Sequence, residues 1–147
     1  MDANQLSDLY EIQKLKARYF RLMDTKQWDA WRDLFTDDME LFLENGALPE
    51  ADTPTLSGAD ALVAYLSSSH PGKVTVHQGH MPEIELTSPT TATGIWALND
   101  IVIWPDGTRL TGYGHYHETY EKISGDWKIT SSKLTRLHTD IRAPESG

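Results

Sequence analysis

Apolar residues recur every three or four positions near the start of the chain. They are Leu9, Ile12, Leu15, Tyr19, Leu22 and Met23. This spacing places them on one stripe of an amphipathic helix, which we expect from Leu9 onward. A second, short helix is predicted after Asp24 and Thr25, with an end at the Thr-Asp-Asp sequence 36–38 and a buried face of Trp28, Trp31, Leu34 and Phe35. The two helices would form a hairpin.

The next segment, 45–58, has no apolar periodicity and is rich in Pro, Gly and acidic residues. It is predicted to be a long surface loop. Ser57 and Asp60 have the spacing of a capping box, which indicates a helix through Ala61, Leu62, Tyr65 and Leu66. The sequence SSSHPGK at 67–73 is expected to end this helix.

The rest of the chain is typical of β-strands, because β-branched and aromatic residues dominate and turn signals divide the segments. We expect strands at 74–86, 90–104, 108–123 and 127–138, with turns at 105–107 and 124–126 and a frayed tail at 139–147. Helices followed by consecutive strands indicate an α+β domain in which one curved antiparallel sheet carries helices on one face. A single domain covering 1–147, with an ordered core at about 6–140, suits this length.

Charge and composition narrow the range of functions. The chain has 147 residues, a net charge of −9 and no cysteine. The negative charge argues against nucleic-acid binding, and the lack of cysteine excludes disulfides, thiolate metal sites and a thiol nucleophile. The sequence has neither a signal-peptide pattern at its start nor an apolar run long enough for a membrane span, so we expect a cytoplasmic location.

The strand at 90–104 is apolar on both alternating faces, so either Asn99 or Asp100 must lie in an apolar setting. A buried carboxylate needs a partner or a raised pKa. Asp100 is therefore a candidate acid. Alternatively, it caps a backbone group or pairs with Arg136, which would otherwise be a cation at the rim of the sheet.

Two histidines stand three positions apart in the strand at 74–86. A regular strand would place His77 and His80 on opposite faces, but a bulge at Gly79 could reset the alternation. A half-buried imidazole oriented by a carboxylate is suited to act as a base near neutral pH. The alternative is a core histidine bonded to a backbone carbonyl.

The spacing of His115, His117 and Glu121 matches the first metal motif of cupins. No second cupin motif follows, and a cupin would not begin with amphipathic helices. We therefore predict no metal site, although His115 or His117 could line a cavity.

The set of motifs resembles the SnoaL-like, scytalone dehydratase-like branch of the nuclear transport factor 2-like superfamily. The resemblance covers about 12–138 and is carried by the stretches 12–38, HQGHMPEIEL at 77–86, TTATGIWALND at 90–100, 117–129 and 134–136. Within the family, the motifs are most similar to those of the bile-acid 7α-dehydratases. The resemblance implies a cone in which the N-terminal helices close a curved, antiparallel or mixed sheet around a central pocket.

By motif, the resemblance also implies the residues of the pocket. Tyr19, Asp24, His77 and Asp100 would be catalytic; Tyr19 and Asp24 taken alone would be read as a core tyrosine and a helix N-cap. Arg136 would bind substrate by the same match. Beyond the resemblance, we expect four further substrate-binding residues in the pocket: Trp96, Tyr113, His115 and His117. The segment 109–120 and the loop 46–58 depart from the family pattern, so the substrate stays open.

The expected function is that of a cofactor-independent lyase that dehydrates a small, hydrophobic, oxygenated hydroxy-carbonyl compound through proton abstraction by His77. There are three alternatives: an isomerase or cyclase using the same enolate, an epoxide hydrolase using Asp24 and Asp100, and a non-catalytic carrier of hydrophobic ligands. We expect a homo-oligomer, either a dimer or a trimer, with no nucleic-acid or membrane partner.

Overall fold

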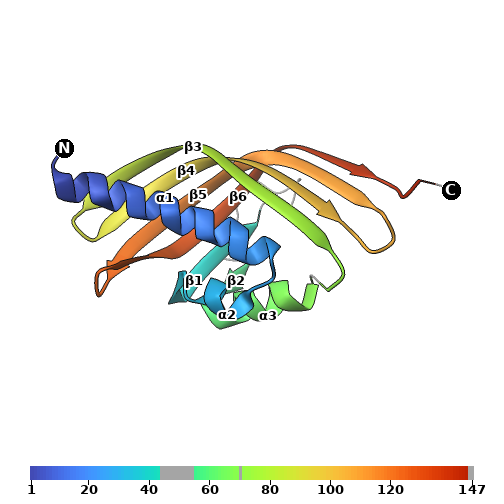
Figure 1. The fold of residues 1–147 in the computed structure, drawn as a ribbon, viewed down its shortest axis with the longest axis horizontal. Helices are drawn as coiled ribbons and strands as arrows, with labels where there is room; N and C mark the ends of the chain where they lie inside the picture. The colour runs from blue at the N-terminus through green and yellow to red at the C-terminus, as the bar shows by residue number, and fades with distance from the viewer. Residues whose placement is uncertain (44–54, 70, 146–147) are drawn as a thin grey trace.

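The computed structural model describes residues 1–43, 55–69 and 71–145. Its helices are α1 (Ala3–Asp24), α2 (Trp28–Arg32) and α3 (Ala59–Ser69), and its strands are β1 (Phe35–Leu43), β2 (Leu56–Ser57), β3 (Val74–Ser88), β4 (Thr91–Ile103), β5 (Arg109–Ile123) and β6 (Asp126–Arg142). Figure 1 shows α1 lying along one face of a sheet whose long strands run obliquely beneath it. The expected α+β arrangement is confirmed.

Helix α1 begins six residues before the predicted start because Asp2 forms a capping box with Gln5. The Asp2 carboxylate accepts the backbone N–H of Gln5, and the Gln5 side chain accepts the backbone N–H of Asp2. The predicted apolar residues of α1 are buried except Leu9, which is half-buried, and one residue that was not predicted, Lys16, is buried with them.

The predicted end of the second helix is wrong. Helix α2 ends at Arg32, and the Thr-Asp-Asp sequence 36–38 lies inside strand β1. Met39 and Leu41 are buried while Glu40 between them is exposed, which is the alternation of a strand with one face on the core. Strand β1 runs parallel to β6 and antiparallel to β2.

Most of the predicted loop at 45–58 lies outside the described residues. Its end does not fit the prediction, because Leu56 and Ser57 form β2 and pair with Leu41 and Glu40. Helix α3 follows as predicted and buries Ala59 and Leu62.

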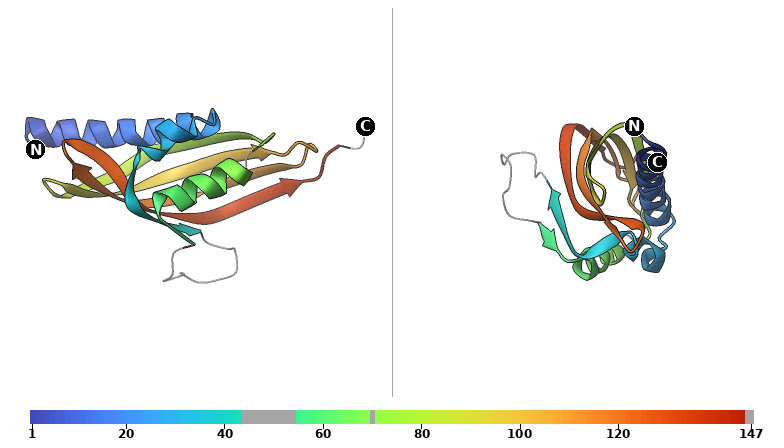
Figure 2. Two further views of the ribbon diagram at one scale, coloured as in Figure 1. Left: turned by 90° about the horizontal axis from the view of Figure 1, so that it is seen from below. Right: turned by 90° about the vertical axis from the view of Figure 1, so that its left-hand side faces the viewer.

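The six strands form one sheet in the order β2-β1-β6-β5-β4-β3. Neighbouring strands are antiparallel except for β1 and β6. Figure 2 shows that the sheet is strongly curved and unclosed, with α1 along one side; in its right-hand view α2 and α3 lie at the bottom, below the sheet. The predicted tail is partly wrong, because β6 continues to Arg142 by pairing with β5 as far as Arg109.

The sheet has a helix-covered inner face and an open outer face. Inner residues of β4 and β5 include Trp96, Leu98, Tyr116 and Tyr120, which are buried in the core with α1. Outer residues include Val76, Ile95 and Tyr113, which are more than a third exposed. Within the described part of the chain, none of the helices is both long and apolar enough to cross a lipid bilayer.

Candidate active site

The end of α1 meets the beginning of β3 through one carboxylate. Asp24 Oδ1 lies 2.7 Å from His77 Nδ1, and Asp24 Oδ2 accepts the backbone N–H of His77 at 2.8 Å. The hydroxyl of Thr75 also donates to Asp24 Oδ1, at 2.9 Å. Asp24 therefore does not cap α2, whose N-cap residue is Gln27. Asp24 instead binds the start of β3, through the backbone N–H of His77 and the inward side chains of Thr75 and His77.

These bonds determine which nitrogen of His77 is available. A carboxylate that already accepts two N–H or O–H donors favours the tautomer in which Nδ1 carries the proton. The other nitrogen, Nε2, lies 4.0 Å from Asp100 Oδ2, which is longer than a hydrogen bond. Because the His77 side chain is 11% exposed, Nε2 offers a lone pair in a water-poor setting.

The predicted bulge at Gly79 is wrong, and this separates the two histidines. Gly79 pairs regularly with Leu98, and the register first shifts beyond it, between His80 and Glu83, where Met81 has a positive φ of 40°. His77 therefore faces inward and His80 faces the outer side of the sheet. Gly79 serves close packing instead, because a Cβ there would lie 2.7 Å from the ring of Phe20.

Asp100 pairs with Arg136 beside this dyad. Arg136 donates from Nη1 to Asp100 Oδ1 at 2.5 Å and from Nη2 to Oδ2 at 3.0 Å. Burial lowers the pKa of Arg136, but the hydrogen bonds and charge of Asp100 outweigh burial and raise it. Guanidinium has only donors, so both Asp100 oxygens act as acceptors. This arrangement corresponds to the ion-pair alternative for Asp100 and not to a protonated acid.

Two backbone features make room for this ion pair. The β5–β6 register shifts between Tyr113 and Gly114, which leaves Leu137 unpaired and 76% exposed while Arg136 faces inward. Gly112 faces Asp100 across β4 and β5, and a Cβ at this position would collide with both Arg136 Nη1 and Asp100 Oδ1. Only glycine leaves space for the pair.

Tyr19 on α1 and Tyr116 on β5 form an aromatic wall next to these charges. Their ring centroids are 5.9 Å apart with nearly perpendicular planes. Burial raises the pKa of Tyr19, and the charges of Glu118, Asp24 and Asp100 raise it further. Burial likewise raises the pKa of Tyr116. Both phenols are therefore neutral hydrogen-bond donors.

The other residues expected to bind substrate lie elsewhere. Tyr113, His115 and His117 alternate with inward-facing Gly112, Gly114 and Tyr116, so they lie on the outer face of β5. Tyr113 stacks on His138, and His117 Nε2 lies 3.2 Å from the Thr135 hydroxyl. All three therefore lie on the opposite face of the sheet from His77.

Trp96 does face inward, but the Trp96 indole N–H donates to the Tyr120 hydroxyl at 2.9 Å. The indole N–H of Trp96 is therefore already hydrogen-bonded within the core.

The sequence predicts that His115, His117 and Glu121 do not form a metal site. Among residues 1–43, 55–69 and 71–145, no cluster of three or more His, Asp or Glu side chains has the geometry to hold a metal ion.

Sequence reasoning missed the contributions of Thr75, Gly112, Tyr116 and the buried Lys16–Glu118 ion pair. The signal for the last was present: Lys16 falls on the apolar stripe between Ile12 and Tyr19. A lysine at such a position needs an acidic partner.

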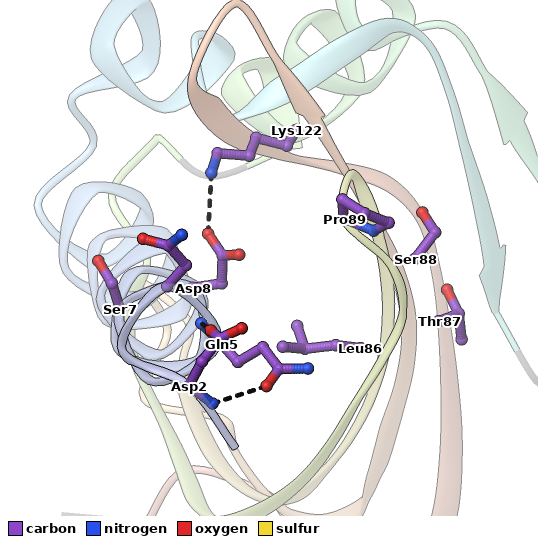
Figure 3. A pocket seen from close by; sticks show the side chains of 10 residues that line it. Asp2, Gln5, Ser7, Asp8, Leu86, Thr87, Ser88, Pro89 and Lys122 are labelled. Atoms are coloured by element: carbon purple, nitrogen blue, oxygen red, sulfur yellow. Dashed lines mark hydrogen bonds and ion pairs between the residues drawn. The ribbon is translucent and has the colours of Figure 1, made fainter.

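A separate surface pocket of about 610 Å³ lies near the opposite end of α1. Figure 3 shows Asp2, Gln5 and Asp8 of the helix facing Leu86 and Lys122 across it. Asp8 already accepts hydrogen bonds from Lys122 and Trp127, both at 3.0 Å. Asp8 is about 24 Å from Asp24 along the helix, so this pocket is not part of the candidate active site.

Comparisons with known proteins found a family model and relatives that match most of this chain. The family model for the SnoaL-like domain matches residues 4–133. A probable cyclase, FGR4, of Gibberella zeae is 28% identical over 134 residues, which cover 86% of this chain and 89% of that protein.

Solved structures share the fold. A scytalone dehydratase-like protein of Novosphingobium aromaticivorans has a TM-score of 0.83 at 21% identity, covering 98% of this chain and 95% of its own. A type 2 hexachlorocyclohexane dehydrochlorinase, LinA, has a TM-score of 0.82 at 20% identity, covering 97% and 94%. Because the family model matches most of this chain, the chain belongs to the SnoaL-like domain family.

Proposed function

We propose that the protein is a cofactor-independent lyase that removes water from a small hydroxy-carbonyl compound, with His77 as the base. The observation that carries the proposal is the Asp24–His77 dyad, in which Nδ1 is bound to a carboxylate and Nε2 is directed toward the Asp100–Arg136 pair. The enzymes and probable enzymes among the similar proteins, a dehydrochlorinase and a cyclase, support chemistry of the lyase or isomerase type.

In the first step, His77 Nε2 takes the proton from the carbon next to the carbonyl. The electron pair of the C–H bond forms the C=C bond of an enolate, and its charge moves to the carbonyl oxygen. Asp24 stabilises the imidazolium that results, because its carboxylate is already bound to Nδ1. A base positioned in this way typically contributes ~10²–10⁴-fold to the rate.

The enolate oxygen would be bound by the hydroxyl of Tyr19. The ring of Tyr116 packs edge-on against that of Tyr19, which would hold the Tyr19 hydroxyl in place as a preorganised donor. Loss of one such donor typically costs ~10²–10³-fold in rate. Arg136, held by Asp100, would bind a second oxygen of the substrate, and Asp100 holds this donor in place.

In the second step, the enolate electron pair re-forms the carbonyl, the C=C bond shifts to the neighbouring carbons, and the C–O bond of the hydroxyl group breaks. The leaving hydroxide takes the proton from His77 Nε2 and departs as water. Atoms and charge balance, and His77 returns to its neutral form without another reactant.

The proposal is tested by incubating the protein with a panel of aromatic and alicyclic β-hydroxy ketones and following formation of the conjugated enone by ultraviolet absorption. We expect turnover of at least one compound by the wild-type protein and loss of it in His77→Gln. Turnover by His77→Gln at the wild-type rate would contradict the assignment of the base.

A cyclase or isomerase working through the same enolate is the second candidate, supported by the 28% identity to the probable cyclase. For such an enzyme, solvent deuterium would enter at the acidic carbon without loss of water. A carrier would bind a compound of the panel with neither exchange nor turnover. The specific likeness to bile-acid 7α-dehydratases and the homo-oligomeric state stay predictions from the sequence.

A further inference from the structure

A buried ion pair lies behind the aromatic wall, on the side away from Asp100. Lys16 Nζ on α1 lies 2.8 Å from Glu118 Oε2 on β5, and both side chains are fully buried, with an exposed fraction of 0%. Ser132 donates to Glu118 Oε2 and Tyr120 donates to Glu118 Oε1, each at 2.9 Å. The glutamate is therefore fixed from three sides, and it fixes the ammonium of Lys16.

The ammonium faces two rings of the candidate site. Lys16 Nζ lies 3.7 Å from the ring centroid of Tyr19 and 3.7 Å from that of Tyr116. The ring of Phe20 is 4.9 Å away. A cation over the face of an aromatic ring is attracted to it, and the attraction is strongest where water is excluded.

A buried pair of this kind is a poor device for stability alone. Desolvation of the two charges offsets most of their attraction, so an apolar pair of similar volume is often as stable or more stable. The position of Lys16 gives a different reason for it: Tyr19 is one turn further along α1, and Tyr116 precedes Glu118 by two residues on the same inner face of β5. Both partners of the ion pair therefore neighbour a phenol of the site.

We propose that Lys16 is a positioning residue whose ammonium, anchored by Glu118, holds the rings of Tyr19 and Tyr116 so that their hydroxyls are placed to donate hydrogen bonds to an oxyanion. The two cation–π contacts fix the orientation of the rings and therefore the direction of their O–H groups. This inference rests on the proposed role of Tyr19 in binding the enolate oxygen. It assigns a function to a lysine that contacts no substrate.

The probe is 4-nitrophenolate, a planar anion whose oxygen resembles that of an enolate and whose absorption band moves to shorter wavelength when the oxygen accepts stronger hydrogen bonds. The test variant is Lys16→Met/Glu118→Gln, which removes one positive and one negative charge and leaves the net charge unchanged. Its folding is checked by circular dichroism and thermal unfolding.

We expect the wild-type protein to bind 4-nitrophenolate with a shift of its absorption band to shorter wavelength. Tyr19→Phe should lose both binding and shift. The double variant should bind roughly tenfold more weakly, the effect of one desolvated cation–π interaction, with a smaller band shift. A merely structural role of the ion pair would not change the band of bound probe.

The matched control is Arg32→Met/Asp60→Asn, which removes an ion pair of 2.8 Å between α2 and α3 in which the Asp60 side chain is 92% exposed. It also preserves net charge and should bind the probe like the wild-type protein. If Lys16→Met/Glu118→Gln does not fold, Lys16→Gln/Glu118→Gln replaces the ion pair by an amide pair and is measured in the same way. Failure of both variants to fold would assign the pair to stability and overturn the proposal.

Unchanged affinity and an unchanged band in a folded double variant would overturn the positioning role, as would absence of binding to the wild-type protein. These outcomes are distinct from failure of the proposed function, which is decided by the turnover of His77→Gln. That variant keeps Tyr19, Tyr116 and Lys16 and should still bind 4-nitrophenolate.

Discussion

The carboxylate of Asp24 and the imidazole of His77 are 53 residues apart in the chain and 2.7 Å apart in the fold. The same carboxylate accepts the backbone N–H of His77, so it fixes both the ring and the strand that carries it. A histidine held at two points loses little further entropy on reaching a reactive orientation. This is the geometric basis of the proposed base.

The dyad predicts a difference between histidines on the two faces of the sheet. His77→Gln and Asp24→Asn should each lower the turnover rate by ~10²–10⁴-fold, because one removes the base and the other removes the group that orients it. The double variant His115→Ala/His117→Ala should keep wild-type turnover, since both residues lie on the outer face. Steady-state kinetics on the same β-hydroxy ketone measures all three. A rate loss in the outer-face variant comparable to that of His77→Gln would contradict this assignment.

Arg136 and Arg142 on β6 form a second matched pair. Arg136 binds Asp100, whose side chain is 5% exposed, whereas Arg142 is 78% exposed and pairs with Asp140. Arg136→Ala should lower the free energy of unfolding by about 3–5 kcal/mol, because it leaves a buried carboxylate without its partner. Arg142→Ala should lower it by less than about 1 kcal/mol. Urea denaturation of both variants is the measurement, and equal stability losses would be inconsistent with the structure.

The lack of space around Gly112 predicts that a single added methyl group disrupts the site. In Gly112→Ala the new Cβ would occupy the space of Arg136 Nη1 and Asp100 Oδ1, so the ion pair must separate or β5 must shift. Overpacking of this kind typically costs about 1–3 kcal/mol. We expect reduced turnover and a lowered melting temperature, and a crystal structure of the variant should show Arg136 displaced. An intact ion pair in that structure would refute the prediction.

The buried tyrosines predict a loss of stability at alkaline pH. Burial raises the pKa of Tyr19 in the folded protein, whereas an exposed tyrosine in the unfolded chain ionises near pH ~10. Above that pH the unfolded state binds fewer protons than the folded state, so the free energy of unfolding falls as the pH rises. Tyr116 and Tyr120 act in the same direction, and Lys16, whose pKa burial lowers, acts in the opposite one.

Urea denaturation between pH 8 and pH 11 measures this contribution. The free energy of unfolding of Tyr19→Phe should fall less steeply above about pH 10 than that of the wild-type protein. Parallel curves for the two proteins would mean that Tyr19 ionises equally easily in the folded and unfolded states.

Local pattern was enough to predict α1, α3 and the four long strands, because each has a clear period of apolar residues or a turn signal at its ends. It was not enough at β1, whose alternation in Met39 and Leu41 is short and follows a helix directly. It also failed at the end of β6, where the polar residues Thr139 and Asp140 resemble a tail but pair with Gly112 and Thr111. Strand pairing is a long-range property that such short segments do not encode.

The sequence by itself determined the α+β order of elements and supplied Asp24, His77, Asp100 and Arg136 as candidates, since residue type and motif are local properties. Only the tertiary structure decided which of them meet. The unbroken register at Gly79 turned His77 inward and His80 outward, and the bulge at Leu137 turned Arg136 toward Asp100. Because strand faces alternate with every residue, a shift of one position moves a side chain to the other side of the sheet, and such shifts are fixed by pairing between strands.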